Sequence, residues 1–198
     1  LAPCWGYQID ETASVIYGVY SHYEYTQKEE FLKVNLHMCE KAVDFLKRYV
    51  KDLFDGTGIY GPSYDVWEEN EGVHLYSLAA IFAAFEAMLK IYDVLIVGKN
   101  LSDFDNNRLK EEKVNKNIQE NLYDENRKSY VRNANDRRID ISLLGAVYPF
   151  NVFSPKEKKV LNTVDNINLT IRTYTGGYQR YEYDNYRNGA PWPIANLW

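Results

Sequence analysis

The sequence has few of the residues that form disulfide frameworks or metal sites. Its 198 residues include only two cysteines, three histidines and six prolines. Cys4 and Cys39 are far apart in sequence, and two such cysteines are typical of buried thiols. His22, His37 and His74 are isolated, and each is expected to be a surface or capping residue rather than a ligand. We therefore expect no metal and no cofactor.

An excess of positive charge and a long apolar run are also missing. The formal net charge is −5, with 23 Lys and Arg against 28 Asp and Glu. Nucleic acid binding requires clustered basic residues, and the lysines here are scattered, so we expect no nucleic acid partner. The longest nearly apolar run, Leu75–Leu89, contains Glu86 and is shorter than the roughly 18 to 20 residues of a membrane span. It predicts a buried helix, and we expect no membrane partner.

Apolar residues recur at helical spacing and predict three long helices, at about 10–26, 28–55 and 74–97. The first and third have small or apolar residues on nearly all sides, which is typical of helices buried on both faces. The second has charged residues between the members of one apolar stripe, so we expect it on the outside. That stripe consists of Phe31, Met38, Ala42, Phe45, Tyr49 and Leu53.

The rest of the chain is expected to contain loops and shorter elements. The segment 54–63 contains three glycines and one proline, which predict a structured loop. Ser154 and Pro155 are suitable as the cap and first turn of a helix. The elements predicted are a polar, solvent-facing helix at about 103–122, a hairpin of Lys128–Arg132 and Arg137–Ile141 around a turn at Asn133–Asp136, and helices at 140–147 and 155–171.

The segment Tyr64–Asn70 carries the most informative chemistry, because Glu68 and Glu69 directly follow Trp67. Glycoside hydrolysis needs a carboxylic acid that stays protonated until it donates to the leaving oxygen. An indole and a second carboxylate disfavour the ionised form of a neighbouring carboxyl. The alternative is that Glu68, Glu69 and Glu71 form the acidic first turn of the following helix.

Three further segments occur in the order found in one family. They are Trp5–Thr12, Gly72–Ser77 and Gly177–Tyr186, the last leading into Asn188–Pro193. Together with the Asp-x-Trp-Glu-Glu motif, they resemble glycoside hydrolase family fifteen, the glucoamylases and their glucodextranase and trehalase relatives. Each motif is weak by itself, but four in the same order are specific. The resemblance extends from Trp5 to Trp198.

The resemblance implies an all-α fold, an (α/α)6 toroid of inner and outer helices. Such a barrel requires roughly twice this length at about a dozen residues per helix. We therefore expect residues 1–198 to be part of a single catalytic domain, about half of the toroid, with a helix just beginning in the run that ends at Trp198. In the family the general base is a glutamate after the Arg-Tyr-x-x-Asp segment, which would lie beyond Trp198. The isolated fragment is then expected to be inactive.

The resemblance also implies roles for individual residues. Glu68 would be the general acid and Glu69 a ligand of sugar hydroxyls, with Asp65 and Trp67 in the same wall. An alternative for Asp65 is a plain loop cap. Trp5 would stack on a glucose unit, and the alternative is a core tryptophan with Asp10 as the N-cap of the next helix.

Arg180 and Asp184, in the Arg-Tyr-x-x-Asp segment, would bind glucose hydroxyls, since the planar guanidinium can grip two neighbouring oxygens. The alternative is that Arg180 merely pairs with Asp184 on a loop. Tyr183 stands where relatives often have an acidic residue or glycine. We expect one concavity to be lined by Trp5, Trp67, Glu68, Glu69, Arg180 and Asp184.

The function implied is release of glucose from the non-reducing ends of α-glucans by inverting hydrolysis, without a cofactor. The expected partner is an α-glucan or oligosaccharide, together with the remainder of the catalytic domain. Two alternatives stay open. One is a trehalase or glucodextranase of the same family, and the other is a carbohydrate-binding or regulatory relative without turnover. The presence of both Glu68 and Glu69 favours catalysis.

Overall fold

The computed structural model describes residues 6–56, 62–95 and 101–198, and most of this chain is helical. The predicted all-α fold is confirmed. No helix in the described ranges is both long and apolar enough to cross a membrane. The helices are α1 (Ile9–Thr26), α2 (Glu29–Asp55), α3 (Leu75–Leu95), α4 (Leu101–Asn121) and α5 (Lys158–Thr170), with 3-10 helices η1 (Ile141–Ala146), η2 (Tyr186–Gly189) and η3 (Ile194–Asn196).

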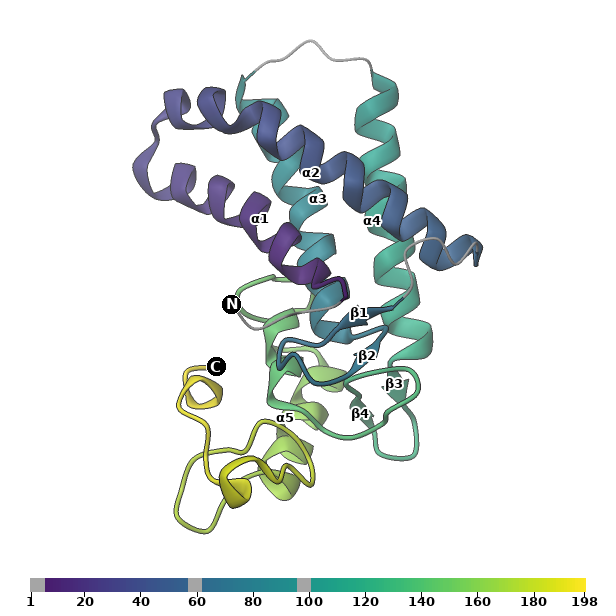
Figure 1. The fold of residues 1–198 in the computed structure, drawn as a ribbon, viewed down its shortest axis with the longest axis vertical. Coiled ribbons are helices and arrows are strands. Elements are labelled where there is room, and N and C mark those ends of the chain that lie inside the picture. The colour runs from purple at the N-terminus through teal and green to yellow at the C-terminus, as the bar shows by residue number, and fades with distance from the viewer. Residues whose placement is uncertain (1–5, 57–61, 96–100) are drawn as a thin grey trace.

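Helix α3 lies at the centre of the helical layer, and α1, α2 and α4 pack around it (Figure 1). Its small residues, such as Ala79, Ala80, Ala83 and Ala84, are all buried and allow the neighbouring helices to approach closely. Larger side chains, among them Phe85, fill the remaining space. The prediction that this helix is buried on nearly all sides is confirmed.

Helix α1 is less buried than the sequence predicted. Ile9, Ala13 and Ile16 form one buried stripe, whereas Val15 is 49% exposed and Tyr25 is 91% exposed. The expectation that α1 is covered on both faces is wrong for this chain, because only α2 and α3 pack extensively on it within the described ranges. The division into an inner and an outer ring stays a prediction.

Helix α2 buries a stripe one residue later than predicted. Met38, expected in the stripe, is 43% exposed, while its neighbour Cys39 is fully buried. Apolar residues occupy adjacent positions along this helix, so periodicity identifies a broad face but not its centre. Burial raises the pKa of the Cys39 thiol to about 11, as expected of an inert buried cysteine. Cys4 lies outside the described residues.

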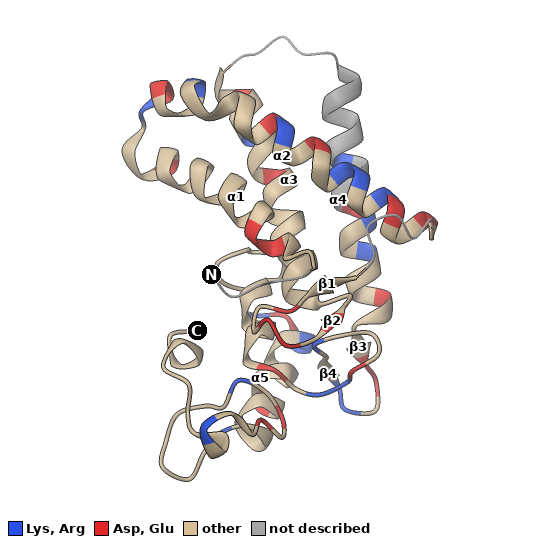
Figure 2. Cartoon of the chain, in the orientation of Figure 1, with Lys and Arg blue, Asp and Glu red and all other residues tan. Residues whose placement is uncertain are grey.

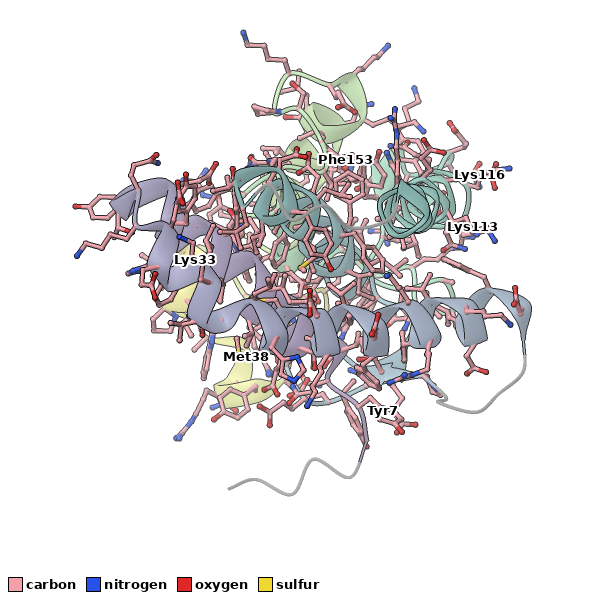
Figure 3. All side chains as sticks on the ribbon, turned by 90° about the horizontal axis from the view of Figure 1, so that it is seen from above. Tyr7, Lys33, Met38, Lys113, Lys116 and Phe153 are labelled. Carbon is pink, nitrogen blue, oxygen red and sulfur yellow. The ribbon has the colours of Figure 1, made fainter. Side chains whose placement is uncertain are left out.

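Helix α4 is polar, as predicted, but it is not entirely solvent-facing. Val114 and Ile118 are buried against the core, whereas Lys113 and Lys116 lie on the outside (Figure 3). Charged residues recur along α2 and the described part of α4 and are sparse on α3 (Figure 2). The distribution of charge is therefore the one expected when an apolar helix, α3, is enclosed by amphipathic neighbours.

The predicted hairpin forms earlier in the chain than expected. The antiparallel strands are β3 (Tyr123–Asp124) and β4 (Ser129–Tyr130), rather than Lys128–Arg132 and Arg137–Ile141. Asp124 accounts for this shift, because its Oδ1 accepts the backbone N–H groups of Asn126 (2.9 Å) and Arg127 (3.1 Å) and so forms the turn. The turn at Asn133–Asp136 does form, but it is flanked by single bridges and not by strands.

One predicted helix start and one predicted helix type are also wrong. Helix α5 begins at Lys158, three residues after Pro155, because Ser154 instead closes a preceding turn in which its N–H donates to Glu157 Oε1 (2.8 Å). The helix expected at 140–147 is the 3-10 helix η1, capped by Asp140, whose side chain accepts the N–H of Ser142 (2.8 Å). The run ending at Trp198 contains only η3.

Asp10 lies in the first turn of α1 and is buried, so the alternative that it is the N-cap is wrong. The N-cap position is Gln8. The Asp10 carboxyl faces α3, where its Oδ1 accepts the hydroxyl of Ser77 (3.2 Å). Burial raises the pKa of Asp10 from 3.8 to about 6. The Asp10 carboxyl therefore keeps its proton to a higher pH than an exposed aspartate does.

We predict that Asp10→Asn stabilises the fold at neutral and alkaline pH. Because the folded pKa of about 6 exceeds the ordinary 3.8, this carboxyl contributes stability below pH 3.8 that is lost as pH rises through about 6. The shift of about two units corresponds to at most about 3 kcal/mol. Urea unfolding should show Asp10→Asn more stable than the parent at pH 8, with the difference vanishing at pH 4.

The matched control is Glu11→Gln, in the same helical turn but exposed. It should change the free energy of unfolding by less than about 0.5 kcal/mol at either pH. A stability difference for Asp10→Asn that is the same at pH 4 and pH 8 would contradict the assignment.

Candidate active site

The acidic segment forms a closed loop between two short antiparallel strands, β1 (Ser63–Tyr64) and β2 (Glu71–Gly72). These strands lie below the start of α1 and lead directly into α3 (Figure 1). The Asp65 N–H donates to the Asn70 carbonyl (2.9 Å) and closes the loop. Helix α3 begins only at Leu75, and Glu71 is in a strand. The alternative that these glutamates form the first helical turn is therefore wrong.

Asp65 lies inside this loop and not on a pocket wall. Its Oδ1 accepts the Glu69 N–H (2.9 Å), its Oδ2 accepts the Asn70 side-chain amide (3.1 Å), and its carboxylate pairs with Arg132. Asp65 is only 3% exposed. This is the arrangement of a loop cap, and it fixes the backbone that carries the two glutamates.

His74 holds the other end of the loop and is buried rather than at the surface. Its Nε2 is 3.0 Å from the Asn70 carbonyl oxygen, and its Nδ1 is 3.4 Å from the Asn133 amide nitrogen. A carbonyl can only accept, so Nε2 carries the proton and Nδ1 accepts. Burial lowers the pKa of His74, which favours this neutral form.

Glu68 has an unusual backbone conformation for a residue with a side chain. Its φ is +60°, in the left-handed region that disfavours L-residues other than glycine, asparagine and aspartate. Tyr183, in the Arg-Tyr-x-x-Asp segment, also has a positive φ of 64°. The two adjacent glutamates thus differ in backbone conformation, since the φ of Glu69 is not positive.

Glu69 is fully engaged by the C-terminal segment. Its Oε1 is 2.8 Å from Arg180 Nη1, and its Oε2 accepts the hydroxyl of Tyr181. Burial, and next the bond to Glu69, raises the pKa of Tyr181 to about 12, so this hydroxyl remains a donor. The acid loop and the Arg-Tyr-x-x-Asp segment are therefore in direct contact.

Arg180 is 5% exposed and also makes two hydrogen bonds to Asp184, from Nε (2.9 Å) and Nη2 (2.8 Å). Burial would raise the pKa of Asp184, but the bonds from Arg180 outweigh it and hold that pKa below its ordinary value. The pair predicted as an alternative thus exists, yet Arg180 reaches Glu69 as well. Aromatic rings surround its guanidinium, from Trp67, Tyr181, Tyr186 and Trp192.

Glu68 differs from its neighbour in being unengaged, although both residues are exposed. Within the described part of the chain, its carboxyl makes no hydrogen bond or ion pair. The adjacent Trp67 is fixed from behind, since its indole N–H donates to Asp140 Oδ2 (3.0 Å). The loop therefore presents one free carboxyl beside a fixed indole and a fixed carboxylate.

These groups surround a cavity of about 390 Å³, a volume suited to a small ligand. A larger hollow, of about 540 Å³, lies between 172–175 and 188–191 and has no carboxylate in its lining. It cannot supply an acid. The first cavity is lined by Val66, Trp67, Glu68, Glu69, Arg180, Tyr186, Trp192, Ile194 and Trp198.

The structure thus brings together four of the six residues expected to share a concavity. Asp184 does not line the cavity, and its carboxylate instead accepts a hydrogen bond from Arg180. Trp5 lies outside the described residues. Trp198 was not expected at this site, and its ring meets that of Trp67 edge to face at a centroid distance of 6.3 Å.

Three residues behind the cavity were missed by sequence reasoning: Arg132, Asp140 and Tyr181. Tyr181 is within the Arg-Tyr-x-x-Asp segment, but only its neighbours were assigned roles. Asp140 precedes an apolar run, and this position could have identified it as a helix cap. The contact between Trp67 and Asp140 has no sequence signal, because it joins segments that are distant in the chain.

We predict that the backbone at Glu68 is strained and that glycine relieves it. A left-handed conformation costs an L-residue about 1 to 2 kcal/mol, and glycine avoids this cost. Part of the gain is lost, because glycine also increases the conformational entropy of the unfolded chain. Glu68→Gly should therefore be more stable than Glu68→Ala by about 0.5 to 1 kcal/mol in urea unfolding. At Glu69, whose φ is not positive, the order should reverse. The same order at both positions would refute strain at Glu68.

Comparisons with known proteins bear on the family and the fold of the chain. The chain is similar to an uncharacterised glycosyl hydrolase of Methanocaldococcus jannaschii, with 27% identity over 195 residues, which cover 96% of this chain and 30% of that protein. It shares its fold, at a TM-score of 0.79 and 19% identity, with a wild-type glycosidase and with a glutamate-to-alanine glycosidase variant in complex with glucose.

Each of these two structural matches covers 98% of this chain and 48% of the other. The chain thus spans about half the length of the solved glycosidases and under a third of the curated relative. The family model of glycosyl hydrolases family 15 matches residues 4–198. With this match over nearly its whole length, the chain belongs to glycosyl hydrolase family 15.

Proposed function

We propose that this chain forms the acid side of a glycosidase active site in which Glu68 is the general acid. The observation that carries the proposal is the contrast between two adjacent carboxyls in one cavity. Glu69 accepts from Arg180 and Tyr181 at its two oxygens, whereas Glu68 has no partner among the described residues and lies at the cavity. A general acid must be free to meet the leaving oxygen, and a substrate ligand must be held in place.

The cavity has the chemistry that a sugar needs. Indole and phenol rings offer flat apolar faces to the C–H faces of a pyranose, and the Arg180 and Glu69 groups offer charged hydrogen-bond partners for hydroxyls. The glucose named for one of the structural relatives supports a hexose as the ligand. We propose that the cavity binds the terminal glucose unit of an α-glucan.

In the proposed reaction, Glu68 donates its proton to the glycosidic oxygen as the bond to the anomeric carbon breaks. A carboxylate on the opposite face would take a proton from water as the water oxygen bonds to the anomeric carbon. Attack from that face inverts the configuration of the anomeric carbon. Glu182 and Asp184 do not suit that second role. Glu182 accepts from Arg127 (2.8 Å) and from the Ile139 N–H (3.0 Å), and Asp184 is held by Arg180. We propose that the base comes from outside residues 1–198.

Two related proposals differ in substrate or in turnover. A trehalase or glucodextranase would share Glu68 and Glu69 and would differ in the shape of the cavity. A carbohydrate-binding relative without turnover would not need a free carboxyl beside an engaged one, so the arrangement of Glu68 and Glu69 favours catalysis. An assay of which disaccharide the complete catalytic domain hydrolyses distinguishes these proposals. We expect maltose to be the substrate.

We predict that Glu68→Gln in the complete catalytic domain lowers kcat on maltose by about two to four orders of magnitude, the usual contribution of a positioned acid. Binding of glucose should change little, because glutamine has nearly the same shape. A glucoside with a nitrophenolate leaving group should lose less, since that group leaves without protonation.

Glu71→Gln is the matched control, because Glu71 is exposed, is in β2 next to the loop and does not line the cavity. It should retain kcat within about twofold. Retention of more than a tenth of the parent's activity on maltose by Glu68→Gln would exclude Glu68 as the acid.

A further inference from the structure

Arg132 is a buried cation directly behind the acid loop, at 2% exposure. Its Nη2 pairs with the Asp65 carboxylate, and its Nε is 3.5 Å from Asp140 Oδ2. Its guanidinium carbon lies 4.3 Å from the centre of the Tyr181 ring, within cation–π distance. Its Nε is also 3.7 Å from Asp136 Oδ2. One guanidinium therefore contacts three separate segments of the chain, through Asp65, Asp140 and Tyr181.

Each of those three groups fixes a different part of the site. Asp65 caps the loop that carries the glutamates, through the Glu69 N–H. Asp140 accepts the indole N–H of Trp67. Tyr181 donates its hydroxyl to Glu69. Because Glu68 has no partner of its own among the described residues, its place is set by the residues on either side of it, and both of these are held by groups that contact Arg132.

We infer that Arg132 is a positioning residue for proton donation, holding Trp67 and Glu69 so that Glu68 is aimed at the leaving oxygen. The inference rests on the proposed function of Glu68. Arg132 does not line the cavity, so it acts through its partners and not on substrate. A displacement of about 1 Å at a reacting group can lower the rate about 100-fold, so loosening this support should affect turnover.

The surroundings of Arg132 indicate a role other than stability. Its Nε and Nη1 make no hydrogen bond to any described residue, although both are buried. Nε still has the carboxylates of Asp140 (3.5 Å) and Asp136 (3.7 Å) near it, whereas Nη1 has neither, and an unsatisfied buried donor costs about 1 to 3 kcal/mol. The nearby Arg138 differs, since it makes a short, well-aligned pair with Asp136 (Nη2 to Oδ2, 2.6 Å) at a partly exposed position. Arg138 also approaches the Tyr181 ring, at 5.0 Å, and none of its recorded bonds reaches Asp65.

The test is Arg132→Lys in the complete catalytic domain, with Arg138→Lys as the matched control. Lysine keeps the positive charge near Asp65, Asp136 and Asp140, but an ammonium cannot bridge two carboxylates and stack on a ring as a planar guanidinium does. On maltose we expect kcat to fall by about tenfold or more and KM to change by less than about threefold. On a nitrophenyl α-glucoside the loss should be smaller, as for Glu68→Gln. Arg138→Lys should keep kcat within about twofold on both substrates.

The leaving-group comparison separates the two proposals. If Glu68→Gln shows no leaving-group dependence, the proposed acid is wrong. If Glu68→Gln shows it while Arg132→Lys keeps parent activity, or loses equally on both substrates, the role of Arg132 is overturned. Should thermal unfolding show that Arg132→Lys does not fold, Asp140→Asn, which keeps Arg132 and removes one of its carboxylates, is judged by the same criteria.

Discussion

The contact between Arg180 and Glu69, 2.8 Å between Nη1 and Oε1, is the interaction on which the site depends. It joins the acid loop to the C-terminal segment across more than half of the chain. Asp184 grips the opposite edge of the same guanidinium, so Arg180 cannot turn away from Glu69. Removing either carboxylate would leave the buried guanidinium of Arg180 without one of its two charged partners. The cavity exists because these two segments are held at a fixed separation.

The helices provide the rigid support for this contact. Helix α3 begins directly after β2, and its buried face fixes where the acid loop emerges. The C-terminal segment is attached by backbone bonds, from the Ile141 N–H to the Arg180 carbonyl (2.9 Å) and from the Glu182 N–H to the Ile139 carbonyl (2.9 Å). The functional side chains therefore lie on short loops, while helix packing sets the distance between those loops.

Sequence reasoning succeeded where a long periodic pattern was present and failed where a few side-chain bonds decide the backbone. Helices α1, α2 and α3 were predicted nearly to the residue, because many apolar positions agree on one period. The hairpin at β3 and β4 was misplaced, because the side chain of Asp124 fixes the turn. The start of α5 was misplaced for a similar reason, since Ser154 and Glu157 form a turn before it. A hydrogen bond from one polar side chain can move the ends of a short element, but it does not change the position of a long helix.

The sequence by itself determined the helical class, the family and the segments that carry the chemistry, since these depend on local order and composition. Only the tertiary structure decided what each carboxyl does. Glu68 and Glu69 are chemically identical neighbours that line one cavity, and they differ because Arg180 and Tyr181 hold Glu69, whereas Glu68 has no partner among the described residues. The support that Arg132, Asp140 and Tyr181 give to the acid loop likewise arises from contacts between distant segments, which spacing along the chain does not specify.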